Sequence, residues 1–198
     1  MGAGLGGGSS DAALALTLLS RMWEAPLSTG DLAALAGGLG SDVPFFLVGG
    51  EADAGGRGER VRPLPDSESV ELLLATPPFP ISTREVYLTI AGDVGPLPSS
   101  LDVETSGRFF GPNDLAFAVL QMRPEMSVLL DSARSLASEA AITGSGSTIV
   151  LKGASADASL RLAARHPETR LHRCRTLSRE EYRVRTESSG GFQWRSPK

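Results

Sequence analysis

The chain has 198 residues, 41% of them hydrophobic and 21% charged, which is the composition of a globular protein with one large domain or two small ones. Its net charge of −4 argues against broad binding to nucleic-acid phosphates, and one cysteine with two histidines provides no thiolate or imidazole cluster for a metal. No run of about 18 apolar residues and no basic-then-apolar leader occurs, so we expect a cytoplasmic protein with no membrane partner.

The chain begins with five glycines in its first eight residues, followed directly by Ser9, Ser10 and Asp11. Apolar residues then recur at helical spacing, which predicts a helix over 12–23, capped by these three residues and buried on most sides. Glycines that lead into the start of a buried helix are typical of a phosphate cradle, because the backbone approaches the anion closely and the helix dipole favours negative charge. A flexible leader or a cloning remnant is the alternative.

Further elements follow from the spacing of apolar residues and from Gly and Pro. Helices are predicted over 31–39, 82–90, 113–121, 125–138 and 156–165. Strands are predicted over 70–76, 148–152 and 169–176, the last at a sheet edge, with an irregular hairpin over 51–64. A long loop is predicted over 92–107, a domain boundary near 65–69, and a disordered tail from Glu187.

The candidate phosphate site has no Walker lysine, because the only lysines are Lys152 and Lys198. Main-chain donors, hydroxyls and a metal would therefore hold the phosphates. Asp42 is the candidate catalytic residue, since in-line phosphoryl transfer needs a group that accepts or orients the substrate hydroxyl. The alternative for Asp42, which precedes Val43 and Pro44, is an N-cap of a short turn.

Other polar residues have ordinary explanations beside the functional ones. Gly144, Ser145 and Gly146 could form a tight turn between a helix and a strand. Arg57, Arg60 and Arg62 could meet a diphosphate, although alternation on an exposed hairpin face explains them equally well. Cys174 is expected to be a small, partly buried hydrophobic residue, and His166 and His172 are expected at the surface.

Four segments, taken in order, resemble the GHMP kinase superfamily. They are the glycine loop over 2–13, the Leu-Gly-Ser-Asp-Val-Pro-Phe-Phe segment over 39–46, the Gly-Arg-Gly-Glu turn over 56–59 and the Gly-Ser-Gly-Ser turn over 144–147. Weaker landmarks of a second domain are Thr76-Pro77, Ser82-Thr83, Tyr87 and Asn113-Asp114-Leu115, whereas Ala116 stands where an acidic residue is common. The resemblance covers roughly residues 2–176.

The resemblance implies an α+β, two-lobed fold: a truncated first domain like ribosomal protein S5 over 1–65, a ferredoxin-like second domain over 66–186, and the tail over 187–198. It implies Asp42 as the catalytic residue, ATP with Mg²⁺ as cofactors, Ser10 as a metal ligand, and Gly144, Ser145 and Gly146 as substrate-binding residues. The residues that it implies for ATP binding are Gly2, Ala3, Gly4, Leu5, Gly6, Gly7, Gly8, Ser9 and Ser10.

The implied reaction is phosphorylation of the 2-hydroxyl of 4-diphosphocytidyl-2-C-methyl-D-erythritol in non-mevalonate isoprenoid synthesis. Two alternatives stay open: another GHMP small-molecule kinase, acting on homoserine, mevalonate or a sugar, and a non-catalytic fragment that binds nucleotides or anions. Members of the superfamily carry a further N-terminal portion, so we expect Met1 to correspond to an internal methionine. We also expect the uncovered face of the first domain to cause self-association or low solubility, and we expect the chain alone to bind ATP weakly with little or no turnover.

Overall fold

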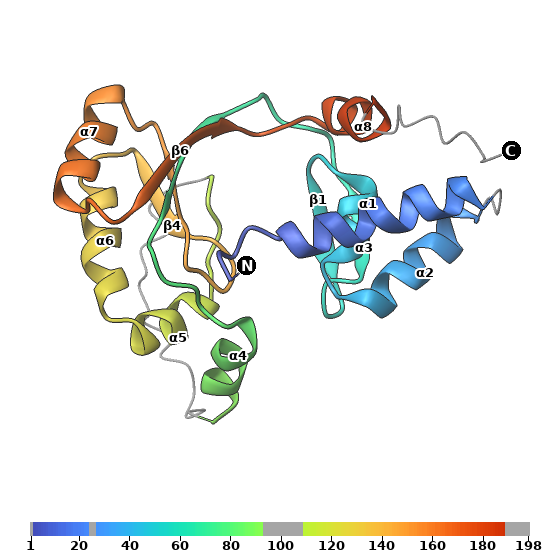
Figure 1. The fold of residues 1–198 in the computed structure, drawn as a ribbon, viewed down its shortest axis with the longest axis horizontal. Coiled ribbons are helices and arrows are strands. Elements are labelled where there is room, and N and C mark those ends of the chain that lie inside the picture. Colours follow the sequence, from blue (N-terminus) through green and yellow to red (C-terminus); the bar gives the residue numbers. More distant parts are fainter. Residues whose placement is uncertain (1, 24–26, 93–108, 189–198) are drawn as a thin grey trace, which may run out of the picture. The chain divides into compact units, whose positions relative to one another are not determined.

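The computed structural model describes residues 2–23, 27–92 and 109–188 (Figure 1). It divides into two compact units. Unit 1 consists of Met1–Leu5 and Val70–Thr176, and unit 2 consists of Gly6–Ser69 and Leu177–Lys198. The chain therefore passes from one unit to the other inside its glycine run, and again on both sides of Val70–Thr176.

Unit 1 contains an antiparallel four-stranded sheet in the order β4-β5-β3-β6. Its elements are, in sequence, β3 (Glu71–Thr76), α4 (Thr83–Gly92), α5 (Leu115–Met122), α6 (Glu125–Arg134), β4 (Glu139–Ile142), β5 (Ile149–Lys152), α7 (Ala156–Arg165) and β6 (Arg170–Arg175). Two strand-helix-strand halves with the first and third strands at the centre define the ferredoxin-like arrangement, so that prediction is confirmed, as is the edge position of β6.

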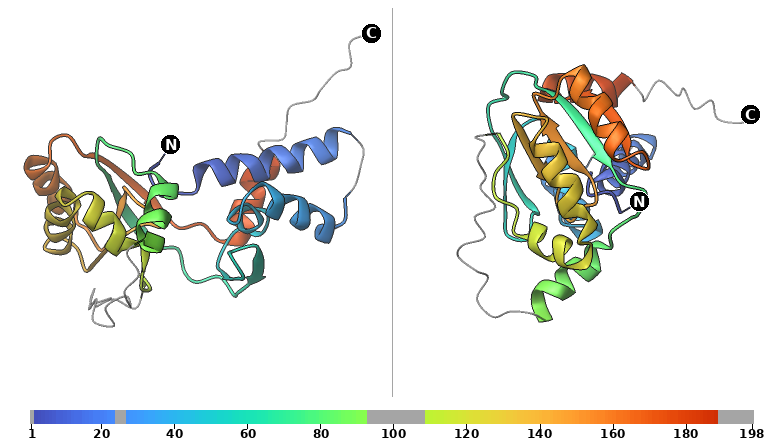
Figure 2. Two further views of the ribbon diagram at one scale, coloured as in Figure 1. Left: turned by 90° about the horizontal axis from the view of Figure 1, so that it is seen from below. Right: turned by 90° about the vertical axis from the view of Figure 1, so that its left-hand side faces the viewer.

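The core of unit 1 lies between this sheet and the helices on one of its faces (Figure 2). Leu73 pairs with Leu151 across β3 and β5, and both are almost fully buried. Leu130 of α6 and Leu162 of α7 belong to the same buried cluster. Burial alternates along β3, with Leu73 and Ala75 facing this core, although the sequence of the strand is a continuous apolar run.

Unit 2 is mostly helical. Its elements are α1 (Gly7–Met22), α2 (Thr29–Leu39), α3 (Val43–Val48), the antiparallel hairpin of β1 (Ala52–Gly55) and β2 (Arg60–Pro63), and α8 (Arg179–Ser188). Its core is small: among the described residues, the hydrophobic cluster of unit 2 has Ala13, Ala36 and Val43 as its buried members, with half-buried apolar side chains packed around them. Helix α2 and the hairpin agree with the sequence predictions, but neither α3 nor α8 was predicted as a helix.

The first helix differs from its prediction in where it starts. It begins at Gly7, inside the glycine run, and Gly6 is its N-cap with φ 67° and ψ 15°. No side chain caps it, so the predicted capping by Ser9, Ser10 and Asp11 is wrong. The reason is that glycine adopts a positive φ without steric cost, so Gly6 makes the turn into the helix and the serines lie within its first turns.

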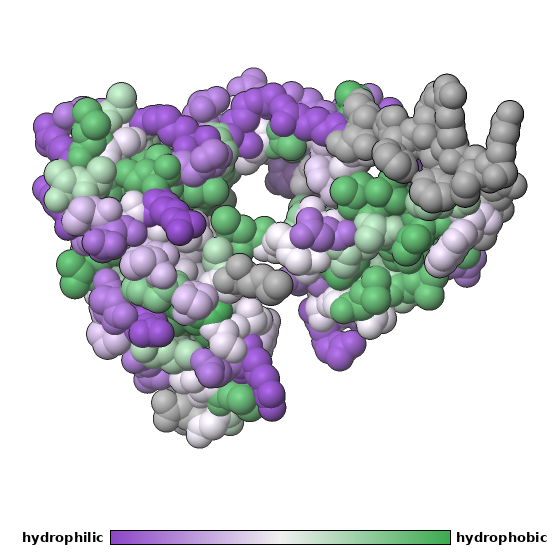
Figure 3. Space-filling model, viewed as in Figure 1, coloured by the Kyte–Doolittle hydropathy of each residue, from purple (hydrophilic) through white to green (hydrophobic). Residues whose placement is uncertain are grey.

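The burial of the first helix also differs from its prediction. Of its side chains only Ala13 is buried, whereas Trp23 at its C-cap is 72% exposed. Leu14, Leu16 and Leu18 are half-buried. Apolar residues gather at the surface over α1 and α2 (Figure 3), and the large ones exposed there are Leu19, Met22, Trp23, Leu35 and Leu39. In the described part of the chain, no helix has the length and apolar character needed to cross a bilayer.

The division into units differs from the predicted domains at both ends. Residues 1–5 belong with unit 1, because the N–H groups of Ile81 and Thr148 donate to the carbonyls of Gly2 and Ala3 at 3.0 and 3.1 Å. Residues after Thr176 belong with unit 2, where α8 packs. The predicted loop over 92–107 and disordered tail from Glu187 lie almost entirely outside the described residues, although α8 continues to Ser188.

Candidate phosphate and phosphoryl-transfer site

The start of α1 presents unpaired backbone donors. The amide of Ser10 is the first in the helix to bond back, donating to the carbonyl of Gly6 at 2.9 Å. The N–H groups of Gly7, Gly8 and Ser9 precede it and have no carbonyl one turn earlier to bond. With the positive end of the helix dipole, these three donors form a site suited to an anion with several oxygens.

The glycines in this turn differ in what their missing side chains would meet. A Cβ on Gly6 would lie 2.7 Å from Cζ of Phe46, so the ring of Phe46 packs directly on the backbone there. A Cβ on Gly7 or Gly8 would meet nothing within 4 Å, and both residues are exposed. The fold therefore requires glycine at position 6, whereas at 7 and 8 there is open space where a side chain would point.

Asp42 lies at the N-cap position of α3, in a helical conformation, and its side chain makes no capping hydrogen bond. The capping explanation of this residue is therefore wrong. Asp42 is exposed. The next residue, Val43, packs with Ala13 of α1 in the core of unit 2. Asp42 and the start of α1 thus belong to one packed unit, with the carboxylate left available to accept a hydrogen bond.

The turn of the β1–β2 hairpin lies beside Asp42. A Cβ on Gly58, whose φ is 117°, would be 3.2 Å from the carbonyl oxygen of Ser41 and 3.6 Å from Oδ1 of Asp42. The arginines of this hairpin are exposed, and Arg62 pairs with Asp53 across it. These observations favour the hairpin-face explanation of Arg57, Arg60 and Arg62 over a diphosphate site.

Helix α8 joins unit 2 through residues that the sequence prediction missed. The backbone N–H of Arg179 donates to Oδ2 of Asp66 at 2.7 Å, and its guanidinium donates to the carbonyls of Glu51 and Leu64. The hydrogen bonds from the amides of Arg179 and Glu51 lower the pKa of Asp66 below its usual value. Tyr182 donates to the carbonyl of Phe46 in α3 at 2.8 Å. No apolar periodicity marks α8, so only long-range polar contacts reveal it.

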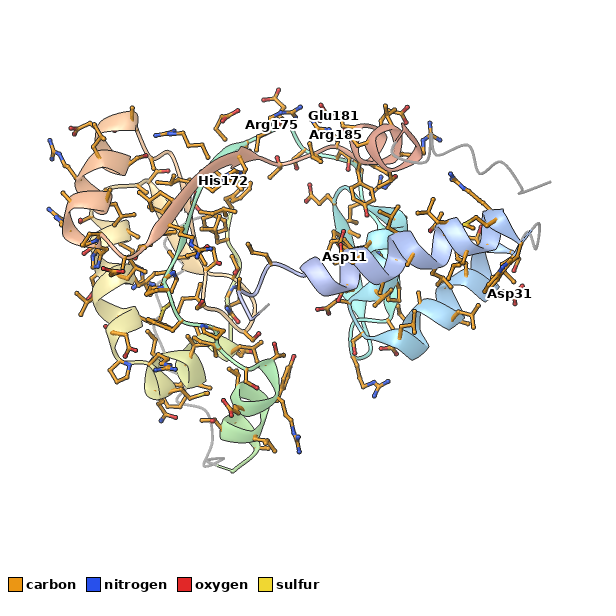
Figure 4. All side chains as sticks on the ribbon, viewed as in Figure 1. Asp11, Asp31, His172, Arg175, Glu181 and Arg185 are labelled. Atoms are coloured by element: carbon orange, nitrogen blue, oxygen red, sulfur yellow. The ribbon has the colours of Figure 1, made fainter. Side chains whose placement is uncertain are left out.

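Helices α1, α3 and α8 line a cavity of about 370 Å³ in unit 2. Its walls are mainly apolar side chains of α1 and α3, with Arg179, Tyr182, Arg183 and Thr186 from α8. Asp11, by contrast, is an exposed residue in the first turns of α1 (Figure 4). Among the described residues, no group of three or more His, Cys, Asp or Glu side chains is placed to hold a metal ion.

The first glycines of the chain occupy a separate environment, in unit 1. A Cβ on Gly4, at φ 71°, would lie 2.4 Å from the carbonyl oxygen of Thr143 and 2.6 Å from that of Gly146. The Gly2–Leu5 segment therefore runs against the Gly144–Gly146 turn. The structure brings these two predicted sets of site residues together in unit 1, and it places Gly6–Ser10 with Asp42 in unit 2.

The Gly144–Gly146 turn joins two strands, β4 and β5, whereas a helix had been expected before it. The short β4 lies in a segment for which no strand was predicted. Asn113 holds the turn, because its Nδ2 donates to the carbonyls of Ile142 and Gly144, both at 2.9 Å. Ser145 is buried, and its hydroxyl is 2.8 Å from that of Thr83, so Gly144 is the exposed residue of the three.

The remaining single residues agree largely with expectation. Cys174 is half-buried in β6, and burial raises the pKa of its thiol. His172 is exposed on the same strand (Figure 4). His166 is half-buried rather than fully at the surface, and its Nε2 lies 2.8 Å from the hydroxyl of Ser132.

Comparison with known proteins gives the class. Residues 1–50 match the family described as GHMP kinases N terminal domain. The glycine-capped start of α1 and Asp42 both lie within this match, and the chain belongs to the GHMP kinase superfamily.

Within that superfamily the chain is similar to one particular enzyme. It is 38% identical over 196 residues to 4-diphosphocytidyl-2-C-methyl-D-erythritol kinase of Symbiobacterium thermophilum, an alignment that covers 93% of this chain and 66% of the relative. It is 37% identical to the enzyme of the same name from Pelotomaculum thermopropionicum, covering 84% of this chain and 62% of the relative. The chain thus spans less than two thirds of the length of these relatives.

A solved structure of an enzyme of the same kind also matches this chain. The crystal structure of a 4-(cytidine 5'-diphospho)-2C-methyl-D-erythritol kinase matches with a TM-score of 0.66 and 35% identity, covering 88% of this chain and 66% of that one. At this identity the agreement extends beyond general architecture, and the mixed helix-and-strand fold of this chain is a GHMP-kinase fold.

Proposed function

We propose that this chain carries the phosphate-binding and phosphoryl-transfer residues of an ATP-dependent kinase acting on the 2-hydroxyl of 4-diphosphocytidyl-2-C-methyl-D-erythritol. The observation that carries the proposal is the start of α1, where Gly6 turns the chain, three backbone amides precede the first helical hydrogen bond, and Gly7 and Gly8 are exposed. The names of the aligned relatives supply the substrate, and the resemblance described above implies the pathway of non-mevalonate isoprenoid synthesis.

In this proposal the N–H groups of Gly7, Gly8 and Ser9 bind phosphate oxygens of ATP, and Gly6 holds the turn. Gly2, Ala3, Gly4 and Leu5 belong to the same loop, with the carbonyls of Gly2 and Ala3 already engaged in unit 1. Because no cluster of acidic or imidazole ligands exists among the described residues, Mg²⁺ would be held by the phosphates together with the hydroxyl of Ser10. Bound Mg²⁺ would neutralise charge that develops on the transferred phosphoryl group.

Asp42 is the residue that we assign to the substrate hydroxyl. Its exposed carboxylate makes no capping bond, so it is free to accept that hydroxyl's proton or to orient it for in-line attack. Gly144, Ser145 and Gly146 are proposed to contact the substrate, with Gly144 as the exposed point of the turn. Residues 1–65 are proposed as the ATP-binding domain and 66–186 as the second domain, adjusted because residues 1–5 group with the second domain and residues 66–69 and 177–186 group with the first.

The proposal is tested by measuring ATP binding by calorimetry and phosphate transfer from labelled ATP to the cytidylyl substrate. Asp42→Asn should lower turnover by about 10²–10⁴-fold and leave ATP affinity nearly unchanged, because the carboxylate acts on the acceptor. Asp131→Asn, at an exposed position of α6, is the matched control and should behave like the unchanged chain. ATP binding without any transfer would favour the non-catalytic alternative, and equal loss of folding and turnover in Asp42→Asn would contradict the catalytic assignment.

The partners proposed are the small-molecule substrate and a second copy of the chain, with neither nucleic acid nor membrane, and the compartment proposed is the cytoplasm. Self-association is supported by the apolar surface over α1 and α2, where Met22, Trp23 and Leu39 are each more than half exposed. Such an exposed apolar patch is unusual on a monomer in water, and its exposed area decreases when two copies associate through it.

A further inference from the structure

Asn113 holds the carbonyl groups of the turn between β4 and β5 in unit 1. Its Nδ2 donates to the carbonyl oxygens of Ile142 and Gly144, both at 2.9 Å. The carbonyl between these two, that of Thr143, accepts from the N–H of Gly146 at 2.8 Å. Three successive carbonyls at the start of the turn are therefore engaged within the protein.

The N–H groups of Gly144 and Ser145, by contrast, have no acceptor among the described residues. The peptide between these two residues is trans, so its N–H lies opposite to its carbonyl. Because Asn113 holds that carbonyl, the N–H of Ser145 points away from Asn113. A backbone donor without a protein acceptor is available to an oxygen of a ligand, and Gly144 is exposed. The turn thus offers donors to a ligand, whereas its carbonyls are occupied.

The contacts of Asn113 require a carboxamide. Its Oδ1 accepts from the N–H of Leu115 at 3.1 Å, at the start of α5. The opposite orientation of the amide would set its oxygen against two carbonyls and its NH₂ against an N–H, so the network fixes the orientation. A carboxylate at this position could accept from Leu115 but would repel the carbonyls of Ile142 and Gly144.

Two roles of Asn113 are therefore carried by different atoms. The contact with Leu115 supports the start of α5, where Asp114 is the N-cap and makes no capping bond with its side chain. That structural role needs only Oδ1. The contact with the turn needs the two hydrogens on Nδ2, so substitutions can separate the two roles.

Other contacts anchor the turn when the bonds from Asn113 are removed. The hydroxyl of Ser145 lies 2.8 Å from that of Thr83. The hydroxyl of Ser147, a residue that is 1% exposed, donates to the carbonyl of Phe79 at 2.9 Å. Loss of the Nδ2 bonds should therefore change the direction of the peptide groups of the turn while unit 1 stays folded.

We propose that Asn113 is a positioning residue for the phosphate acceptor. By holding the carbonyls of Ile142 and Gly144, it keeps the N–H groups of Gly144 and Ser145 directed at an oxygen of that substrate. The substrate 4-diphosphocytidyl-2-C-methyl-D-erythritol carries diphosphate and hydroxyl oxygens, which accept from such donors. This inference rests on the proposed function, because it concerns how the turn assigned to the substrate makes its contact.

The test measures affinity for this substrate by calorimetry in two variants. Asn113→Asp keeps an acceptor for Leu115 and loses both donors, whereas Asn113→Ala loses all three bonds. Both should weaken substrate binding by about tenfold, because the turn no longer directs its donors, and both should leave ATP affinity unchanged. Gln121→Glu is the matched control: it makes the same amide-to-acid change at an exposed position of α5 and should bind like the unchanged chain.

A purely structural role would separate the two variants, since Asn113→Asp would bind like the unchanged chain and only Asn113→Ala would be weakened; that result overturns the proposal. A loss accompanied by faster hydrogen exchange throughout β5 overturns it as well, because unit 1 would then be unfolding. If the unchanged chain does not bind the substrate, the proposed substrate contact fails and the role of Asn113 falls with it. Binding by the unchanged chain with equal affinities in both variants contradicts the role of Asn113 alone.

Discussion

The two units of this chain bury their apolar residues to very different extents. Among the described residues, the hydrophobic cluster between the sheet and helices of unit 1 has fifteen buried members, whereas that of unit 2 has three. Yet the start of α1 at Gly6–Ser10, Asp42 and Tyr182 all lie in unit 2. The candidate chemistry is therefore located on the less completely packed unit, where local caps and polar contacts have to hold the geometry.

The largest expected effect follows from this difference in packing. Leu73→Ala removes a side chain that is 2% exposed and should lower the free energy of unfolding of unit 1 by about 2–5 kcal/mol, through lost transfer energy and a cavity. Leu35→Ala, in unit 2 at 51% exposure, should change stability by no more than about 0.5 kcal/mol. Urea unfolding followed by hydrogen exchange checks both. Equal losses of unfolding free energy in Leu73→Ala and Leu35→Ala would contradict the difference in packing between the two units.

A second prediction concerns the apolar surface of unit 2. Met22→Glu combined with Leu35→Glu places two charges on the patch over α1 and α2, and the dissociation constant for self-association should rise by about tenfold or more. Leu160→Glu is the control, because Leu160 is 72% exposed on α7 of unit 1. Sedimentation velocity over a range of concentrations measures the effect. A monomer at every concentration, or the same change from both variants, would exclude association through this surface.

The smallest expected effect is the pH dependence of the α8 attachment. The pKa of Asp66 is lowered in the fold, first by the hydrogen bond from the amide of Arg179 and then by that of Glu51. The ionised carboxylate therefore adds stability at pH values above its unfolded pKa of about 3.9, and this stability is lost as the pH falls through the lower folded pKa. Asp66→Asn should reduce protection of α8 amides at pH 7 and have little effect near pH 2. A loss of equal size at both pH values would show that charge plays no part.

Sequence reasoning performs well for elements with their own periodic pattern. The helix over 156–165 is found with its bounds, and β3, β5 and β6 are found within one or two residues. It fails for α8, whose sequence Arg-Glu-Glu-Tyr-Arg-Val-Arg-Thr-Glu-Ser has no apolar stripe, and whose attachment to Asp66 and Phe46 joins residues more than 100 positions apart. A local pattern cannot contain such a contact.

For the candidate site, the sequence identifies the residue types but not their local geometry. The glycine run and Asp42 are recognisable as a motif, while the start of the helix at Gly7 depends on the positive φ of Gly6 and on the ring of Phe46 packed against it. Likewise, aspartate is a residue type that is common at N-caps, but the side chain of Asp42 makes no capping hydrogen bond. No sequence pattern identifies Tyr182, because its hydrogen bond to the carbonyl of Phe46 exists only where α8 packs on α3.

The central claim is that the open amides at the start of α1 bind the phosphates of ATP, and one pair of variants tests it most directly. A Cβ at Gly7 or at Gly38 of α2 meets nothing within 4 Å, both glycines are exposed in helices of unit 2, and valine at either is compatible with the fold. Gly7→Val should therefore weaken ATP binding by about tenfold or more, because its side chain fills the space in front of the amides, whereas Gly38→Val should bind like the unchanged chain. Equal ATP affinities of the two folded variants would contradict the claim.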